Sequence, residues 1–305
     1  IDLDPQIETL KKQISDTNLE IIKMEEEFIK LDEAGLFPNP EMLQRYQQLN
    51  TQLNEVQMEY DRLTAAQPDY IEGIIKEKEE VQKLVAAIDY SEALTITATE
   101  KDVVEACEAG RNYGFRAVVA FPQFIGVIAD RLKGSGVLAQ IPVGFPCGGT
   151  TTRVKCVEAE EGLKRGATDL DMVMNIAAFK GGEYAKVRKD IEEVLAVARP
   201  FKVPFKVIIE IGVLTEEEIC TASRLVLDSG ADFVKTCTGF GPGRATCRAI
   251  ELIKETVGDR IRIKASGGVA SIEDGVALMR SGASVVAMRK HLVEQLEKIA
   301  YQRPA

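Results

Sequence analysis

From Ile88 onward, short runs of β-branched and apolar residues alternate with longer amphipathic segments. This alternation is typical of parallel strands joined by crossover helices. Eight strands are expected, near residues 87–92, 116–121, 138–144, 169–175, 206–211, 232–237, 261–266 and 284–288. Eight strands in about 210 residues favour an α/β fold of the closed (β/α)8 TIM barrel type, although a strand count alone does not exclude a doubly wound sheet. In a barrel, functional side chains lie at the carboxyl ends of the strands.

A different pattern precedes the barrel. Apolar residues recur at spacings of four and three, with Glu, Lys and Gln between them, which predicts two helices with heptad repeats. The first repeat consists of Leu3, Ile7, Leu10, Ile14, Thr17, Ile21, Met24, Phe28 and Leu31, and the second of Met42, Tyr46, Leu49, Leu53, Val56, Tyr60 and Leu63. Because Gly35, Pro38 and Pro40 interrupt the pattern, an antiparallel helical coiled-coil hairpin is expected over residues 1–66.

The barrel domain is expected to cover residues 67–305. A short linker is predicted at Ala65–Asp69, followed by a third helix at Tyr70–Ala87 that leads into the first strand. A heptad repeat identifies a helix interface without identifying the partner. Packing or homo-oligomerisation through the N-terminal helices is favoured over recruitment of a dedicated partner.

The composition excludes several classes of partner. A formal net charge of −10 disfavours nucleic acid and anionic membranes, because both require a dense Lys/Arg surface. Neither an uninterrupted apolar run of about 18 residues nor a secretory signal is visible. These features predict a cytoplasmic protein that binds no membrane.

Cysteine and histidine usage gives no indication of a metal. The six cysteines include no C-x-x-C pair, and His291 is the single histidine. Reduced thiols are therefore expected, and neither a metal nor another cofactor is implied.

Two lysines lie in predicted strand interiors. Strand alternation places Lys235 on one face and Val234 on the other, and it turns Lys264 into the barrel while Ile263 faces outward. Burial and a neighbouring cation both lower a lysine pKa and free the neutral amine that attacks carbonyl groups. An imine-forming pair is therefore favoured, with snorkelling or pairing with carboxylates as the alternative.

Two carboxylates share this interior. Asp171 lies in the middle of a strand whose other face carries Leu170 and Met172, so its carboxylate could neutralise the lysines or transfer protons. Glu210 also points inward by alternation and is expected to support the lysine pair.

Several short motifs follow one another in the order found in one known family. They are Leu132–Val137, Gly144–Pro146, the Asp171 strand, Lys206–Glu210, Val234–Phe240 and Lys264–Gly268. Together they resemble the deoxyribose-phosphate aldolase family from about Ile88 to Val286. The resemblance implies a class I aldolase, an aldehyde-lyase that works through a lysine Schiff base without an external cofactor. It also implies a small-molecule aldehyde or sugar-phosphate substrate, with an acetaldehyde-type donor and glyceraldehyde 3-phosphate as the typical acceptor.

The same resemblance assigns roles to residues. Lys235 would form the imine, Lys264 would lower its pKa, and Asp171 would relay protons. The expected substrate-binding residues are Asp89, Ser91, Thr238, Gly239, Gly267 and Gly268. Arg289 and Lys290 are added as candidates from this sequence itself, not from the resemblance.

The chain departs from the family where the acceptor would bind. Arg289, Lys290 and His291 replace a small Gly/Ser-rich phosphate loop, and Val119 and Phe121 replace small or polar residues. Arg289 and Lys290 could bind phosphate, bind a carboxylate, or remain solvated. A related imine chemistry on a bulkier or unphosphorylated acceptor, and a non-catalytic scaffold, therefore stay open as alternatives.

Overall fold

The computed structural model describes residues 4–92, 94–299 and 301. The chain divides between Glu79 and Glu80 into two compact units. The sequence had placed this boundary after residue 66.

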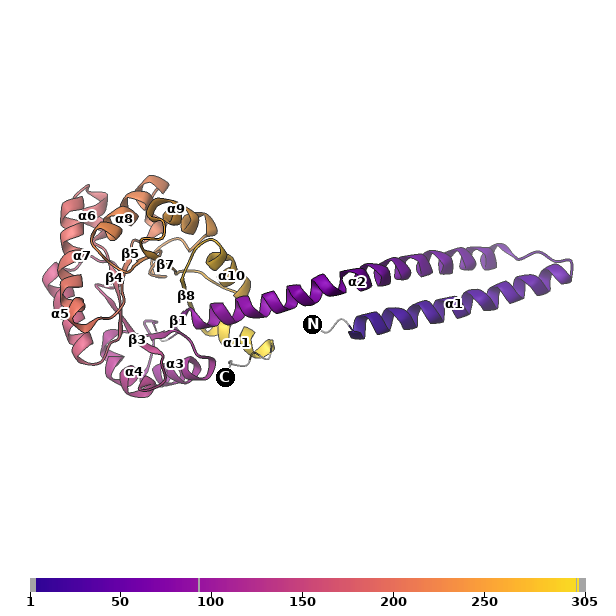
Figure 1. Ribbon diagram of the computed structural model, residues 1–305, viewed down its shortest axis with the longest axis horizontal. Helices are drawn as coiled ribbons and strands as arrows, with labels where there is room; N and C mark the ends of the chain where they lie inside the picture. Colours follow the sequence, from indigo (N-terminus) through magenta and orange to yellow (C-terminus); the bar gives the residue numbers. More distant parts are fainter. Residues whose placement is uncertain (1–3, 93, 300, 302–305) are drawn as a thin grey trace. The chain divides into compact units, whose positions relative to one another are not determined.

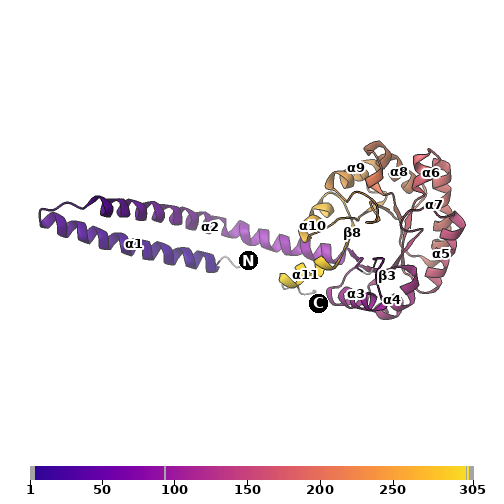
Figure 2. The ribbon, with the colours of Figure 1, turned by 180° about the vertical axis from the view of Figure 1, so that it is seen from behind.

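The N-terminal unit is a helical hairpin. Helix α1 spans Asp4–Glu33 and helix α2 spans Pro40–Ala86. Figures 1 and 2 show α1 alongside the N-terminal part of α2 in the opposite direction. Ring contact between Phe28 and Tyr46, with centroids 5.4 Å apart, lies on the predicted interface. Leu3 and the side chain of Leu63 lie outside the described residues.

The predicted linker and third helix are wrong, because α2 is continuous from Pro40 to Ala86. Pro68 removes one backbone hydrogen bond but does not end the helix. The flanking segments are rich in Ala, Glu, Gln and Lys, which favour helix strongly enough for the helix to continue.

The C-terminal unit is a barrel of parallel strands surrounded by helices (Figure 1). Its strands are β1 Ile88–Tyr90, β2 Ala117–Val119, β3 Leu138–Val143, β4 Asp169–Val173, β5 Phe205–Ile208, β6 Phe233–Lys235, β7 Arg262–Ala265 and β8 Val285–Met288. Its helices are α3 Glu100–Tyr113, α4 Ile125–Leu132, α5 Thr152–Lys164, α6 Ile176–Lys180, α7 Tyr184–Ala198, α8 Glu216–Asp228, α9 Cys247–Val257, α10 Ile272–Arg280 and α11 Lys290–Lys298. Short 3-10 turns lie at η1 Pro122–Phe124, η2 Arg199–Phe201 and η3 Ile211–Val213.

The sheet is closed in sequence order, from β1 to β8 and back to β1. The predicted TIM barrel is thus confirmed. The register sets Lys235 beside Lys264 on β6 and β7 and Asp171 beside Lys206 on β4 and β5. Because neighbours in register point to the same side of a sheet, this pairing gathers charged side chains in the barrel interior.

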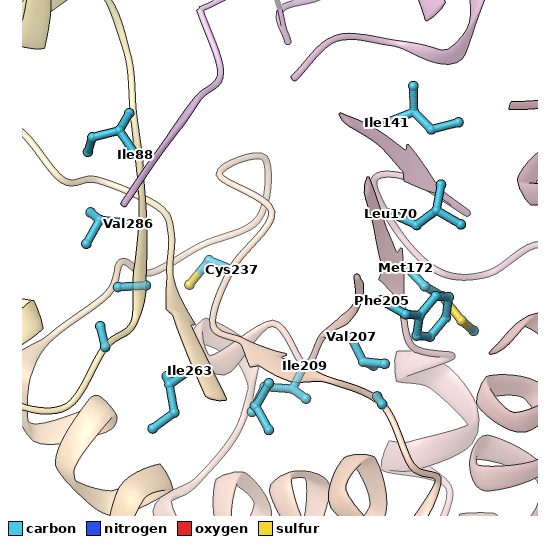
Figure 3. Packing of buried hydrophobic residues seen from close by; sticks show 14 of the residues in the cluster. Ile88, Ile141, Leu170, Met172, Phe205, Val207, Ile209, Cys237, Ile263 and Val286 are labelled. Carbon is cyan, nitrogen blue, oxygen red and sulfur yellow. The ribbon is translucent and has the colours of Figure 1, made fainter. Parts of the chain in front are cut away.

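The outward faces of the strands form the main apolar core. Leu170, Met172, Val207 and Ile263 belong to this cluster and are almost fully buried (Figure 3). Their neighbours along the strands, such as Asp171 and Lys264, are buried too but pair with each other inside the barrel. The expected alternation is therefore confirmed for these strands.

Candidate active site

The carboxylate of Asp171 joins the two lysines. Its Oδ2 atom lies 2.7 Å from Nζ of Lys235 and 2.6 Å from Nζ of Lys264. All three side chains are buried, and they come from β6, β7 and β4. The structure thus brings the three predicted catalytic residues together at one point.

The pKa values of the two lysines are shifted in opposite directions. Burial lowers the pKa of Lys235 to about 8, with Lys264 acting in the same direction against the attraction of Asp171. For Lys264, burial is outweighed by Asp171 and Asp89, which raise its pKa. Burial opposes ionisation of Asp171 as well, but Lys206, Lys235 and Lys264 hold its pKa well below the usual range. Lys235 is therefore the lysine that most readily becomes a neutral amine.

A second layer of charges lies beneath this group. Arg116, just before β2, bridges Asp89 and Asp169, with 2.8 Å between its guanidinium and Oδ2 of Asp169. Lys206 also contacts Asp169 and lies 3.2 Å from Oδ1 of Asp171. Asp89, expected to bind substrate, is fully buried in this layer, 2.5 Å from Nζ of Lys264. It is not among the residues that line the cavity above.

A cavity of about 230 Å³ opens above the lysines. Its lining includes the predicted residues Lys235, Lys264, Ser91, Thr238, Gly239, Gly267, Gly268 and Arg289. It also includes Leu94, Val119, Ser266, Val269, Ala287, Met288 and His291. Most of the predicted substrate-binding residues therefore share one cavity with both lysines.

Lys290 does not join them. Its residue is exposed at the start of α11 and is not part of the cavity lining. Its backbone N–H donates instead to Oε2 of Glu92 at 2.8 Å. The sequence could not distinguish the two adjacent cations, because the orientation of each depends on where the helix begins.

Glu210 has a different role from the one expected. The residue adopts a left-handed backbone conformation after β5, with φ of 56°. Its Oε2 accepts hydrogen bonds from the hydroxyl of Thr238 at 2.5 Å and from its backbone N–H at 3.1 Å. The hydroxyl of Thr238 in turn accepts from the N–H of Phe240 at 3.0 Å. Glu210 therefore fixes the loop after β6 rather than pairing with the lysines.

Three phenylalanines form a cluster from loops that follow β2, β3 and β6. The ring centroids of Phe121 and Phe145 lie 6.1 Å apart, and those of Phe145 and Phe240 lie 5.0 Å apart. Both pairs meet edge to face, a favourable arrangement for aromatic rings. Because all three residues follow strands, the cluster lies at the carboxyl end of the barrel, the same end as the cavity, but none of the three rings is among the lining residues.

Sequence reasoning missed Arg116, Gln140 and His291. Gln140 donates to Asp171 and accepts from Nζ of Lys264 at 3.2 Å. His291 lines the cavity, and its Nε2 lies 2.8 Å from the carbonyl of Val269. Arg116 directly precedes the first residue of β2, where strand alternation does not predict which way a side chain points. His291 carried one signal, its position two residues after Arg289.

The arrangement can perform carbonyl chemistry at an amine. A lysine with a lowered pKa faces a cavity, and a carboxylate within hydrogen-bond distance can transfer protons. Within the described residues, no group of three or more His, Cys, Asp or Glu side chains could hold a metal ion. The described helices also include none with the length and apolar character needed to span a membrane.

Comparison with known proteins agrees with this chemistry. The family model described as DeoC/LacD family aldolase matches residues 83–298. A deoxyribose-phosphate aldolase from Caldanaerobacter subterraneus subsp. tengcongensis is 41% identical over 212 residues, which cover 69% of this chain and 91% of the relative. One from Staphylococcus haemolyticus is 44% identical over 187 residues, covering 61% and 84%.

Solved structures give the same picture. The chain described as "QR15, an Aldolase" matches with a TM-score of 0.67 and 32% identity, covering 71% of this chain and 97% of that chain. The tetrameric deoxyribose phosphate aldolase from Aeropyrum pernix matches with a TM-score of 0.67 and 28% identity, covering 72% and 92%.

Proposed function

Since this chain belongs to the DeoC/LacD family of aldolases and is therefore a lyase, we propose that it cleaves and forms carbon–carbon bonds through an imine on Lys235. The observation that carries the proposal is the contact of Lys235 and Lys264 with one oxygen of Asp171 below the cavity. A buried amine with a pKa of about 8 is neutral far more often at pH 7 than an ordinary lysine.

The proposed reaction proceeds in four steps. The neutral amine of Lys235 adds to the aldehyde carbon, and the carbinolamine loses water to give a protonated imine. The imine accepts the electron pair of the breaking carbon–carbon bond, while a base removes the proton of the hydroxyl group on the leaving carbon. An aldehyde leaves, and the remaining enamine takes up a proton at carbon. Water then hydrolyses the imine and releases the second aldehyde. Asp171 lies close enough to Lys235 to transfer protons in these steps.

We propose deoxyribose 5-phosphate as the substrate, with acetaldehyde as the donor product and glyceraldehyde 3-phosphate as the acceptor. Backbone at Gly239, Gly267 and Gly268 lines the cavity and can approach an anion closely. Arg289 lines the same cavity and would add a charge-assisted contact to the phosphate.

A bulkier or unphosphorylated acceptor is the second candidate. The cluster of Phe121, Phe145 and Phe240 favours it, because three aromatic rings at the cavity's end of the barrel suit an acceptor with less charge. A comparison of phosphorylated and unphosphorylated acceptors in the parent chain separates the two candidates. In Arg289→Ala we expect KM to rise about 10-fold or more for the phosphorylated acceptor alone. An equal change for both acceptors would contradict phosphate binding by Arg289.

Borohydride trapping tests the chemistry itself. The full chain is mixed with acetaldehyde and borohydride, which reduces an imine to a stable secondary amine, and the adduct is located by peptide mass spectrometry. We expect one adduct on Lys235 and none in Lys235→Ala. Lys290→Ala is the matched control, because Lys290 is exposed and outside the cavity. A folded parent chain without any adduct would refute the imine mechanism.

We also propose that the chain forms a homo-oligomer through its helical hairpin. The family model starts at residue 83, so the hairpin is an addition to the aldolase unit. A solved aldolase from Aeropyrum pernix is described as tetrameric. An added helical interface would provide a further means of assembly.

A further inference from the structure

The charges inside the barrel do not balance. Three carboxylates, Asp89, Asp169 and Asp171, contact four cations, Arg116, Lys206, Lys235 and Lys264, among the described residues. Apart from Arg116 and Lys235, which are 16% and 4% exposed, these side chains are fully buried. Water therefore does little to compensate an extra charge. With all groups ionised, the interior carries one positive charge too many.

Each lysine has a different share of the carboxylates. Lys206 contacts Asp89, Asp169 and Asp171, and Lys264 contacts Asp89 and Asp171. Lys235 contacts Asp171, which it shares with both. Lys235 and Lys264 both line the cavity, but the side chain of Lys235 is 4% exposed whereas that of Lys264 is fully buried. Loss of one proton from this network is therefore least costly at Lys235.

Arg116 is the cation that creates the excess. Its guanidinium contacts one oxygen of Asp89 and one of Asp169. The negative charge of these two carboxylates is therefore shared between Arg116 and the lysines. Because these carboxylates raise its pKa further, arginine remains charged throughout the working pH range. Without Arg116, three lysines would face three carboxylates, and the ionised groups would balance.

We propose that Arg116 is a positioning residue that shifts Lys235 toward its neutral amine form by giving the barrel interior one more cation than it has carboxylates. The proposal rests on the proposed imine function of Lys235, and it assigns a role to a residue at the opposite end of the barrel interior from the cavity. Arg116 itself touches no residue of the cavity lining in the described contacts.

Other charged groups around the network are few. The strands contribute Asp89 from β1, Asp169 and Asp171 from β4, Lys206 from β5, Lys235 from β6 and Lys264 from β7, whereas Gln140 on β3 is uncharged. Glu210, Arg289 and His291 lie beyond the carboxyl ends of β5 and β8. Arg262, at the start of β7, lies over the ring of Phe233 at 4.0 Å, and Arg116 lies over the same ring at 5.8 Å. Arg262 is exposed and has no ion pair with the three carboxylates, which makes it a matched control.

The test measures the protonation of Lys235 without using imine chemistry. The full chain is labelled briefly with acetic anhydride at a series of pH values, and the acetylation of Lys235 is quantified by peptide mass spectrometry. In Arg116→Met we expect the midpoint of labelling to rise by about one pH unit, which is about a tenfold lower labelling rate at pH 7. Arg116→Lys, which keeps the cation, should restore most of the parent midpoint, and Arg262→Met should leave it in place.

A second set of variants tests whether the number of charges, and not Arg116 alone, sets the midpoint of labelling. Asp169→Asn alone removes a carboxylate and should lower the midpoint, and the double variant Arg116→Met/Asp169→Asn restores one excess cation and should return close to the parent. An unmoved midpoint in folded Arg116→Met would overturn the proposal. If Arg116→Met does not fold, an unmoved midpoint in Asp169→Asn overturns it equally. Failure of borohydride trapping in the parent chain would refute the proposed imine function. It would not affect the labelling result, which measures only the protonation of Lys235.

Discussion

At the scale of single residues, the catalytic proposal depends on the difference between two neighbouring lysines. Lys235 and Lys264 touch the same oxygen of Asp171, yet burial lowers the pKa of Lys235 while Asp171 and Asp89 raise that of Lys264. A lysine with a pKa of about 8 is neutral about 300 times more often at pH 7 than one at 10.5. The neutral fraction reaches one half at about pH 8 and levels off at higher pH, so imine formation should follow the same curve.

Lys264→Met should raise the pKa of Lys235 and so move this curve to higher pH. Lys264 repels the protonated form of Lys235, and its removal lets Asp171 stabilise that form more strongly. We expect imine formation at pH 7 to slow about 10-fold, with the loss partly recovered at higher pH. The measurement is the pH dependence of borohydride trapping, with Lys264→Arg as the variant that retains the charge. A uniform loss at every pH would show that Lys264 acts through something other than the protonation of Lys235.

At the scale of elements, helix α11 combines features that favour and oppose an anion. The start of a helix attracts negative charge, and Arg289 lies at this start and lines the cavity. However, Glu92 already accepts a hydrogen bond from the N–H of Lys290 at 2.8 Å. A substrate phosphate near the start of α11 would therefore be repelled by the carboxylate of Glu92, which already accepts one of the hydrogen bonds that this helix end can donate.

Glu92→Gln should therefore strengthen binding of phosphorylated substrates. The amide oxygen can still accept from Lys290, but the negative charge is gone. We expect KM for deoxyribose 5-phosphate to fall about threefold to tenfold, because charges at helix ends contribute about 0.3–1 kcal/mol and like-charge repulsion adds to this. Unphosphorylated deoxyribose is the control substrate, for which KM should not change. A fall for both sugars would point to a change of cavity shape instead.

Side chains within the regular strands could be predicted from the sequence better than those outside them. Strand alternation correctly predicted that Lys235 and Lys264 share the barrel interior, because a period of two leaves little choice once Val234 and Ile263 must face the helices. Side chains outside the regular strands were harder. Glu210 follows a strand in a left-handed conformation, and Arg116 precedes one, so alternation could not predict that they contact Thr238 and Asp89. The network of ion pairs requires the closed register of eight strands, which no local pattern contains.

At the scale of the whole molecule, the chain consists of two compact units. Every residue of the cavity and of the buried charge network lies between Asp89 and His291, within the aldolase unit. The hairpin contributes none of them. Its helix α1 exposes Leu19, Ile22 and Ile29, which are 52%, 49% and 59% accessible in the single chain. An apolar stripe of this kind is stabilised when another surface covers it.

Two variants of the full chain test whether a second copy covers this stripe. We expect Ile22→Glu/Ile29→Glu to lower the mass measured by light scattering while the rate of borohydride trapping per chain stays the same, because new charges weaken an apolar interface without reaching the barrel. The matched control is Val154→Glu/Val157→Glu on α5, where both valines are similarly exposed at 52% and 53%. A lower mass in the α5 variant alone would place the interface on the barrel. An unchanged mass in both would leave the exposed stripe of α1 without a role in assembly and refute the proposed function of the hairpin.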